Sequence, residues 1–290
     1  AQQNNIVVAG GLENMTNAPY ILSKARKGFR MGHADVKDHM FLDGLEDAYE
    51  EGKLMGSFAE DTAEHYQFTR EQQDNFAITS LERAKKANED GTFESEIVPI
   101  KVLNRKNEII INKDEQPFKS DITKIPTLKP AFRKNGTVTA ANSSSISDGA
   151  SSVILMLESE AQKRGIKPLA RIIDHSTNSQ EPKWFTTAPI GAIEKVLEKS
   201  GWKKTDVDLF EVNEAFAVVP MAVMKDIGIS NDILNIYGGA CALGHPVGAS
   251  GTRIVTTLIN ALKKNNLKKG VASLCIGGGE ATALTLEIIN

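Results

Sequence analysis

The sequence predicts an α/β protein in which helices cover the faces of a mostly parallel sheet. Strand-like apolar segments alternate with helical periodicities throughout residues 169–290. Glycine-rich segments follow several of the predicted strands, where the chain would turn towards the next element. Of the 290 residues, 41% are hydrophobic and 2 are cysteines, which favours a large packed core and excludes a disulfide-stapled miniprotein.

The second half of the chain gives the order βαβαβαββ. Apolar runs predict strands at residues 169–174, 207–212, 233–237, 271–276 and 282–288. The first helix repeats apolar residues over 192–197 and has Gly201 as its C-cap. The second reaches about residue 227, and Pro220 either kinks it or delays its start. A glycine-rich loop at 238–251 precedes the third helix, whose apolar face runs over 254–262.

The first half makes a smaller unit. We expect a buried strand at 6–9, closed by Gly10 and Gly11, and a second strand at 153–156, with a long insertion between them. Inside the insertion, Thr69 to Gln72 forms a capping box that opens a helix ending near Gly91. Short strands follow at 97–102 and 109–111, and a loop at 124–135. A helix end and turn at 164–168 mark a domain boundary, giving domains 1–164 and 165–290.

Composition and charge exclude several classes of partner. The net charge is -3, from 34 basic and 37 acidic residues, so no basic excess points to nucleic acid. No apolar run is long enough to predict a transmembrane helix, so we expect no membrane partner. Two cysteines in a chain of this length favour a reducing compartment, and we expect a cytoplasmic protein.

Three segments at strand ends carry residues capable of chemistry. They are Asn213–Ala217 after one predicted strand, Gly238–Gly251 before a helix, and Cys275–Glu280 at the end of another strand. In open α/β sheets, ligands bind beyond the carboxyl ends of the strands. We therefore expect the three segments to meet at one site.

Each candidate residue in these segments also has a plain structural interpretation. His245, set among glycines and followed by proline, is either a base or oxyanion donor or a packing residue of a tight loop. Cys275 is either a core cysteine or a reactive thiol beside the N–H groups of Gly277 and its neighbours. Asn213 suits a hydrogen bond to a carbonyl or water, and equally a helix N-cap. Cys241, between two alanines, reads as a small hydrophobe, and a Cys241–Cys275 disulfide is disfavoured by the compartment.

Taken together, these segments resemble the thiolase family. The motifs NEAFA (213–217), GGACALGHPVGASG (238–251) and CIGGG (275–279) have the order and spacing of the family's motifs. The resemblance extends to LMGSFAEDTAE (54–64) and KPAFRKNGTVTAANSSSISDGA (129–150), and so covers the whole chain. It implies a duplicated five-stranded α/β unit of mixed sheets, with a loop domain of about residues 20–135 inserted in the first unit. It also implies that the first unit lacks its opening βαβαβα segment, so that the chain is truncated at its N-terminus.

The resemblance implies an acetyl-CoA C-acetyltransferase that performs a Claisen condensation in fatty acid metabolism. A cysteine accepts an acyl group, with His245 taking its proton, and Cys275 then removes an α-proton from a second acetyl-CoA. Asn213, through water, and His245 stabilise the enolate, and the N–H of Gly277 holds the acyl oxygen. The acyl-accepting cysteine belongs to the absent segment and matches no residue here. Coenzyme A thioesters are the substrates, with no further cofactor and no metal.

The resemblance also assigns binding residues and partners. Ser144, its neighbours Ser143 and Ala140, and Phe132 would contact coenzyme A. Leu54, before Met55, stands where some short-chain members have a histidine, and Phe185 stands at a methionine of their acyl pocket. The family's coenzyme A-contacting arginine is replaced within 117–119. Arg26 and Lys27 fall in an assembly loop, which implies a homodimer or homotetramer.

Three alternatives stay open from the sequence. The protein could be a degradative 3-ketoacyl-CoA thiolase with a longer chain preference. It could be a non-catalytic coenzyme A-binding or assembly subunit, because no residue matches the acyl-accepting cysteine. It could also be one chain of a two-chain enzyme, in which another polypeptide supplies the opening segment.

Overall fold

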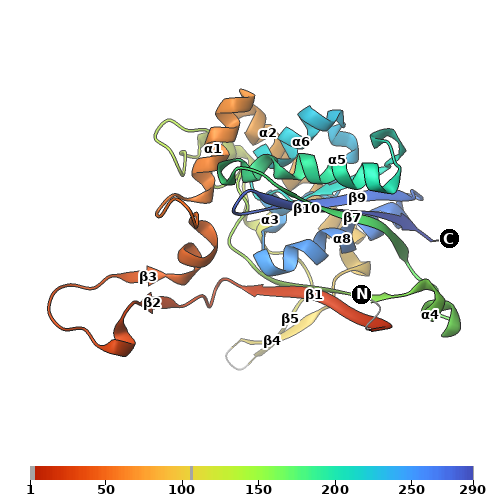
Figure 1. Ribbon diagram of the computed structural model, residues 1–290, viewed down its shortest axis with the longest axis horizontal. Coiled ribbons are helices and arrows are strands. Elements are labelled where there is room, and N and C mark those ends of the chain that lie inside the picture. Colours follow the sequence, from red (N-terminus) through yellow and green to blue (C-terminus); the bar gives the residue numbers. More distant parts are fainter. Residues whose placement is uncertain (1–3, 105–106, 290) are drawn as a thin grey trace.

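The main sheet has four strands in the order β7-β10-β9-β8 (Figure 1). The computed structural model describes residues 4–104 and 107–289. The strands of the main sheet are β7 (Ala170–Ser179), β8 (Leu209–Val212), β9 (Lys269–Ile276) and β10 (Glu280–Ile288). Strand β8 pairs with β9 in parallel, whereas β10 is antiparallel to both β9 and β7.

The expectation of a mostly parallel sheet was therefore wrong for the pairing of neighbouring strands, because two of the three pairs are antiparallel. The reason is the turn at 277–279, which reverses the chain so that β10 lies between β9 and β7. Gly278 and Gly279 have φ of 91° and 90°, values that favour glycine. Strands β7, β8 and β9 still run in one direction, as the alternating order of elements predicts.

The predicted strand at 233–237 is reduced to a single parallel bridge between Phe210 and Leu234. A 3-10 turn occupies Asn231–Ile233, and Asn235 adopts a left-handed conformation with φ of 46°. The prediction of a strand there was wrong because the backbone turns away from the sheet directly after the bridge.

Helices cover both faces of the sheet, each with its own hydrophobic cluster. The helices α5 (Ala188–Ser200) and α6 (Val218–Val223) lie on one face and α8 (Val247–Lys264) on the other (Figure 1). Gly201 caps α5 in the left-handed region, as predicted. Pro220 falls in the first turn of α6, so that helix starts late rather than kinking.

The glycine-rich segment is more ordered than the predicted loop. It contains the short helix α7 (Ala240–Leu243), and α8 already begins at Val247. The predicted end of the loop at Gly251 was therefore wrong. Pro246 immediately precedes the helix, and the following glycines are tolerated in its first turns.

A two-stranded antiparallel sheet packs against the other side of α8. It consists of β1 (Ile6–Asn14) and β6 (Asp148–Met156) (Figure 1). The expectation of a buried strand closed by two glycines was wrong, because β1 continues to Asn14 and Val8 is 71% exposed. Gly11 is needed for packing, since a Cβ there would lie 1.8 Å from the carbonyl oxygen of Gly248 in α8.

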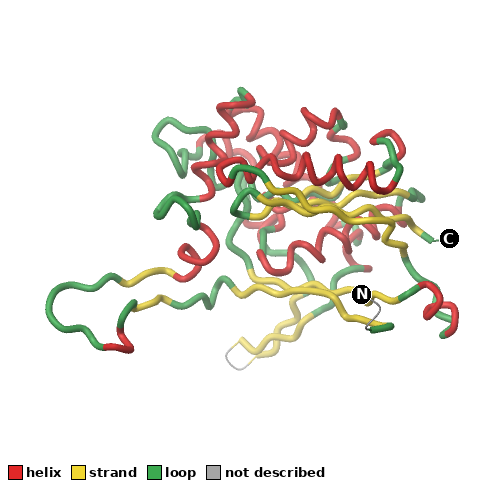
Figure 2. Tube along the Cα trace, viewed as in Figure 1, coloured by secondary structure: helices red, strands yellow, loops and turns green. Residues whose placement is uncertain are grey.

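The insertion between β1 and β6 contributes two long helices and an extended arm. Its elements and the helix that follows β6 are β2 (Tyr20–Leu22), β3 (Val36–Asp38), α1 (Met55–Tyr66), α2 (Arg70–Glu89), β4 (Ile100–Asn104), β5 (Asn107–Ile111), α3 (Gln116–Lys119) and α4 (Glu158–Lys163). The capping box is confirmed, since Thr69 Oγ1 accepts from Gln72 N at 3.2 Å and Thr69 N donates to Gln72 Oε1 at 2.9 Å. Figure 2 shows the β2–β3 hairpin reaching far from the body of the molecule. Within the part of the chain that the structure describes, no helix is long and apolar enough to span a bilayer.

Candidate active site

Asn213 lies directly beyond the carboxyl end of β8, beside β9. Its backbone N–H donates to the carbonyl oxygen of Ser273 in β9 at 2.9 Å. Because β8 and β9 are parallel, Asn213 and Cys275 emerge at the same edge of the sheet. The structure thus places two of the predicted residues at neighbouring strand ends.

The side chain of Asn213 meets His245 across this edge. Asn213 Nδ2 lies 3.2 Å from His245 Nε2, and His245 Nδ1 lies 2.6 Å from Ser250 Oγ in the first turn of α8. The Ser250 hydroxyl donates its single proton to the carbonyl oxygen of Pro246 at 3.0 Å. It must therefore accept from Nδ1–H, which leaves Nε2 unprotonated and able to accept the Asn213 amide proton.

His245 is a neutral imidazole in this environment. Burial of the ring, and secondly the charge of Arg253, lower its pKa from 6.5 to about 4. A neutral ring whose Nε2 lone pair faces the site can accept a proton, and after accepting it can donate a hydrogen bond. The base and donor interpretations of His245 are thus two states of one nitrogen.

Asn213 retains unused hydrogen-bonding capacity. The residue is 1% exposed, and its Oδ1 atom is buried with no hydrogen-bond partner among the described residues. A buried amide oxygen without a partner is costly in a folded protein, so such atoms commonly mark places where a ligand or water binds. The N-cap interpretation fits less well, because α6 begins at Val218, beyond the turn.

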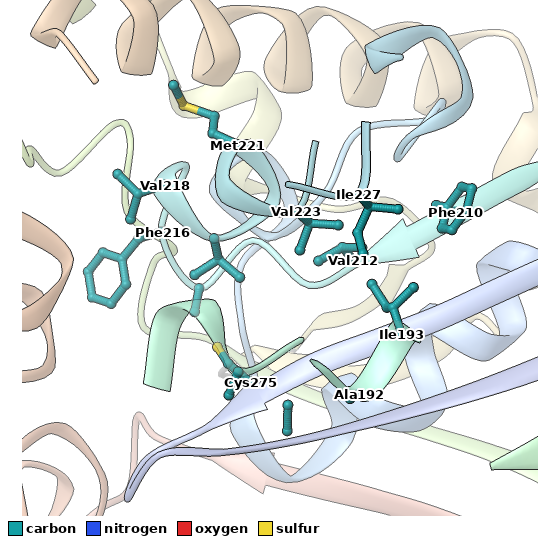
Figure 3. Close-up of a cluster of buried hydrophobic side chains, with 14 of the residues drawn as sticks. Ala192, Ile193, Phe210, Val212, Phe216, Val218, Met221, Val223, Ile227 and Cys275 are labelled. Atoms are coloured by element: carbon teal, nitrogen blue, oxygen red, sulfur yellow. The ribbon is translucent and has the colours of Figure 1, made fainter. Parts of the chain in front are cut away.

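Cys275 lies two residues beyond Ser273, whose carbonyl oxygen accepts from Asn213 N, and it is buried within the hydrophobic cluster that Figure 3 shows together with Phe216 and Val218. Burial raises the pKa of its thiol to about 12. The resting thiol is therefore protonated, and its thiolate is a stronger base than that of an exposed cysteine. Burial likewise raises the pKa of the Cys241 thiol, and both cysteines are free.

The turn after Cys275 lies next to the start of α1. Gly277 is exposed, and a Cβ built on it would lie 3.6 Å from Met55 Sδ at the start of α1. This contact brings the insertion to the end of β9. Met55 and Gly277, which are distant in the sequence, are therefore neighbours.

The segment 142–145 connects two parts of the site. Ser144 N donates to the carbonyl oxygen of Ala215 at 3.0 Å, and Ser143 forms an antiparallel bridge with Phe216. His245 N in turn donates to the carbonyl oxygen of Ser145 at 3.2 Å. This segment, the polar loop, is therefore attached both to the turn that carries Asn213 (the Asn213 turn) and to the loop that carries His245 (the His245 loop).

The remaining candidate residues lie around these segments at different depths. The Phe132 ring packs edge-on against Phe216 with centroids 5.9 Å apart, whereas Ala140 is exposed and contributes no described hydrogen bond to the site. Phe185 is 3% exposed, packs edge-on against Phe58 and belongs to the same cluster as Cys275. Leu54 immediately precedes α1 and bridges to Glu46.

Sequence reasoning gave no role to Ser250, Glu214, Asn235 or Ser80. Ser250 orients His245. This role could have been predicted only from a helix that starts directly after Pro246, because residue 250 then falls in the first turn. The other three form a buried network behind Asn213, and only Glu214, adjacent to Asn213, carried a signal in the sequence. Among residues 4–104 and 107–289, no three His, Cys, Asp or Glu side chains are grouped to hold a metal ion.

Comparisons with known proteins agree with this geometry. Residues 1–159 match the family model described as "Thiolase, N-terminal domain", and residues 166–288 match "Thiolase, C-terminal domain". The chain belongs to the thiolase family. The thiolase resemblance found in the sequence motifs is therefore confirmed.

Individual thiolases resemble the chain over almost its full length. A probable acetyl-CoA acetyltransferase of Dictyostelium discoideum is 51% identical over 282 residues, covering 97% of this chain and 68% of the relative. Acetyl-CoA acetyltransferase 2 of Arabidopsis thaliana is 48% identical, covering 99% of this chain and 72% of the relative.

Solved structures show the same fold. The crystal structure of the Bacillus anthracis acetyl-CoA acetyltransferase superposes with a TM-score of 0.95 at 43% identity, covering 99% of this chain and 72% of that chain. A thiolase from Ascaris suum, solved in complex with coenzyme A, gives a TM-score of 0.93 at 39% identity, with coverages of 99% and 73%. The thiolase-like α/β fold expected from the sequence is confirmed.

Proposed function

We propose that the protein is an acetyl-CoA C-acetyltransferase of the thiolase type. It condenses two acetyl-CoA molecules to acetoacetyl-CoA and catalyses the reverse thiolysis. The observation that carries the proposal is the Asn213–His245 contact of 3.2 Å, oriented by Ser250 and placed at the strand edge from which Cys275 emerges. The acetyl-CoA acetyltransferases among its relatives support the same activity.

The residues of the site divide the carbon–carbon bond-forming step among them. The Cys275 thiol first gives its proton to the thiolate of the coenzyme A that leaves in acyl transfer. The resulting Cys275 thiolate then removes a proton from the methyl carbon of acetyl-CoA, which suits the high basicity that its burial confers. Asn213, through water, and protonated His245 donate hydrogen bonds to the enolate oxygen. The N–H of Gly277 holds the oxygen of the acyl thioester that the enolate attacks. The acyl group itself is carried by a cysteine that matches neither Cys241 nor Cys275.

Coenzyme A thioesters are the substrates in this proposal, and neither a metal nor an organic cofactor takes part. We assign contacts with coenzyme A to Ser143, Ser144 and Ala140, with Phe132 and Met55 from the insertion. Support comes from the attachment of the polar loop to both catalytic segments. The Ascaris thiolase, solved with coenzyme A, is a structural relative in which such contacts can be compared.

An acetyl preference fits the packing around Phe185 and Leu54. Phe185 fills its space against Phe58 in the cluster that contains Cys275, leaving little room there for a long acyl chain. Leu54 places an apolar side chain one residue before Met55. The degradative, longer-chain activity is the second candidate, and the substrate profile decides between them.

We also infer a two-domain organisation, with domains 1–164 and 165–290, and self-association into a homodimer or homotetramer. The β2–β3 arm supports self-association, because it projects from the body with Tyr20 71% and Met31 100% exposed. Its basic residues include Arg26 and Lys27. Two free cysteines suit a reducing compartment, and we place the protein in the cytoplasm.

Two assays test the activity. The first follows exchange of the acetyl-CoA methyl protons for deuterium by NMR, which needs proton abstraction and enolate stabilisation but no carbon–carbon bond formation. The second measures thiolysis of acetoacetyl-CoA. Replacing Cys275→Ser should abolish exchange, and Asn213→Ala should slow it about a hundredfold with little change in KM.

Cys241→Ala is the matched control, since both cysteines are free and Cys241 is proposed only as a packing residue. It should retain exchange. Exchange that survives Cys275→Ser but not Cys241→Ala would overturn the assignment of the base. Binding of coenzyme A without exchange, condensation or thiolysis would overturn the enzyme in favour of a coenzyme A-binding subunit.

A further inference from the structure

A buried hydrogen-bonded cluster behind Asn213 has no part in the proposed chemistry. It consists of Ser80 from α2, Glu214 from the turn after β8, and Asn235 from the segment before α7. These residues are 3%, 1% and 2% exposed. Three distant parts of the chain therefore converge directly behind the site. We call these three residues the Ser80–Glu214–Asn235 cluster.

Asn235 completes the edge of β8 with its side chain. Its Oδ1 accepts from Val212 N at 2.8 Å, and its Nδ2 donates to the carbonyl oxygen of Val212 at 2.8 Å. The side-chain amide thus replaces the backbone of the strand that ends at the Leu234 bridge. Val212 is the residue before Asn213, so this pairing fixes the backbone from which the Asn213 side chain projects.

Glu214 holds the other side of the same contact. Its Oε1 accepts the second Nδ2 proton of Asn235 at 2.9 Å, and its Oε2 accepts from Ser80 Oγ at 2.7 Å and from Cys241 N at 3.1 Å. The same Ser80 oxygen accepts from Gly239 N at 2.9 Å. A Cβ on Gly239 would lie 2.3 Å from the Glu214 carboxyl carbon, so the start of the His245 loop packs directly on this carboxylate.

We propose that Glu214 and Asn235 are positioning residues that set the separation between Asn213 and His245. Asn235 fixes the chain entering Asn213, and Glu214 fixes both the chain leaving it and the loop that leads to His245. This proposal rests on the proposed function, since it assigns the cluster to the enolate-stabilising pair of that reaction. It extends the site to residues that touch no substrate.

The chemistry of the cluster makes it sensitive to small changes. Both Nδ2 protons and the Oδ1 of Asn235 are used, and the two carboxylate oxygens of Glu214 accept three hydrogen bonds in total. A fully satisfied buried network specifies one geometry, whereas removal of one partner leaves the others unpaired. Displacements of about 1 Å at a catalytic pair cost about a hundredfold in rate.

Asn235→Gly is the main test, because φ of 46° at this position suits glycine and the substitution removes only the side chain. Glu214→Gln is the second variant, since it keeps the shape but cannot accept all three hydrogen bonds. Asn88→Ala is the matched control. Asn88 is also a buried asparagine, 6% exposed, and donates to Ala84 O at 2.9 Å in α2, away from the pair.

The first readout is the pKa of His245, titrated by NMR of its ring and independent of turnover. The Asn213 amide donates to neutral Nε2 and therefore stabilises the neutral ring. If the cluster positions Asn213, Asn235→Gly and Glu214→Gln should raise this pKa towards 6.5, while Asn88→Ala leaves it unchanged. Arg253, the charged group that acts on the ring, is intact in all three variants.

The second readout is methyl-proton exchange of acetyl-CoA. Both cluster variants should lower kcat by about tenfold to a hundredfold with little change in KM. Folded cluster variants with wild-type His245 pKa and wild-type kcat would overturn the proposal, as would equal losses in Asn88→Ala. If the wild type shows no exchange, the proposed function fails, but the His245 titration still decides whether the cluster positions the pair.

Discussion

At the scale of single residues, the site depends on a histidine, His245, that is held neutral and in one tautomer. His245 is neutral because its ring is buried and lies near Arg253, and Ser250 selects which nitrogen faces Asn213. A histidine at an exposed position would change charge near neutral pH. This environment keeps His245 a proton acceptor over the whole physiological range.

The same protonation state predicts a loss of stability in acid. The pKa of His245 is about 4 in the folded protein and 6.5 when unfolded. Between these values the unfolded chain binds a proton that the folded chain does not, so stability falls as the pH drops from 6.5 to 4. The full difference amounts to about 3 kcal/mol. Urea unfolding at both ends of this window measures it.

His245→Gln removes the titrating group and should flatten that part of the pH dependence. The exposed His175 provides a control, because His175→Gln leaves the buried ring in place and should behave like the wild type. Equal pH slopes in the wild type and both variants would show that His245 is not the group responsible.

At the scale of elements, α8 connects the two sheets and carries the residue that orients His245. Its N-terminal turn packs on β1, where a Cβ on Gly248 would lie 2.5 Å from the carbonyl oxygen of Leu12. Gly251, one turn later, has no atom within 4 Å of such a Cβ. Gly248 therefore has no room for a side chain, whereas Gly251 has room for one.

Gly248→Ala and Gly251→Ala should therefore change stability in opposite directions. Gly248→Ala forces α8 away from β1 and should destabilise by about 1–3 kcal/mol. It should also lower activity, because the displaced turn contains Ser250. Gly251→Ala should stabilise by about 0.5–1 kcal/mol, since alanine favours a helix interior. Chemical denaturation of the pair measures both, and two changes of the same sign would contradict this packing.

The 3-10 turn at Pro182–Thr187 carries Phe185, which we expect to limit acyl-chain length. Phe185→Leu opens space beside Phe58 and should shift the kcat/KM ratio about tenfold towards longer 3-ketoacyl-CoA substrates. The loss of packing should cost about 1–2 kcal/mol. Substrate profiles in steady-state kinetics measure the shift.

Phe93→Leu is the matched control for that shift. Phe93 is also 3% exposed and packs edge-on against an aromatic ring, Tyr237, but it lies outside the cluster that contains Cys275. It should lose similar stability with no change in substrate preference. A changed profile in both variants would point to general loosening rather than to a pocket at Phe185.

The elements also show how far a single sequence can be read. Helix α2 was predictable because its capping box and the glycine near its end, Gly91, are local signals. The sequence motifs likewise placed Asn213, His245 and Cys275 at strand ends. The strand expected at 233–237 failed because Asn235 turns the chain, a tertiary effect with no apolar signature. Strand β1 looked buried because Val and Ile fill both of its faces, although only one face packs on α8. The roles of Ser80 and Asn235 arise from contacts between distant segments, which periodicity does not report.

At the scale of the whole molecule, the site is fixed from several sides at once. The main sheet supplies Asn213 and Cys275, α8 supplies Ser250, and the insertion supplies Met55 and Phe132. The polar loop before β6 joins the Asn213 turn to the His245 loop through Ser144 and Ser145. Because residues from all these parts meet at the site, correct docking of the insertion on the sheet is a condition for activity.

The β2–β3 arm projects from the body of the molecule, and it carries the last prediction. Leu22 of β2 pairs with Val36 of β3, so residues 23–35 can be replaced by an Asn-Gly turn that keeps this ladder. The replacement removes exposed Met31 and the basic residues between the strands. Light scattering coupled to size exclusion should show the wild type as a dimer or tetramer, and the trimmed variant as a smaller species with unchanged melting of the body. An unchanged mass in the trimmed variant would mean that self-association, where it occurs, uses another surface.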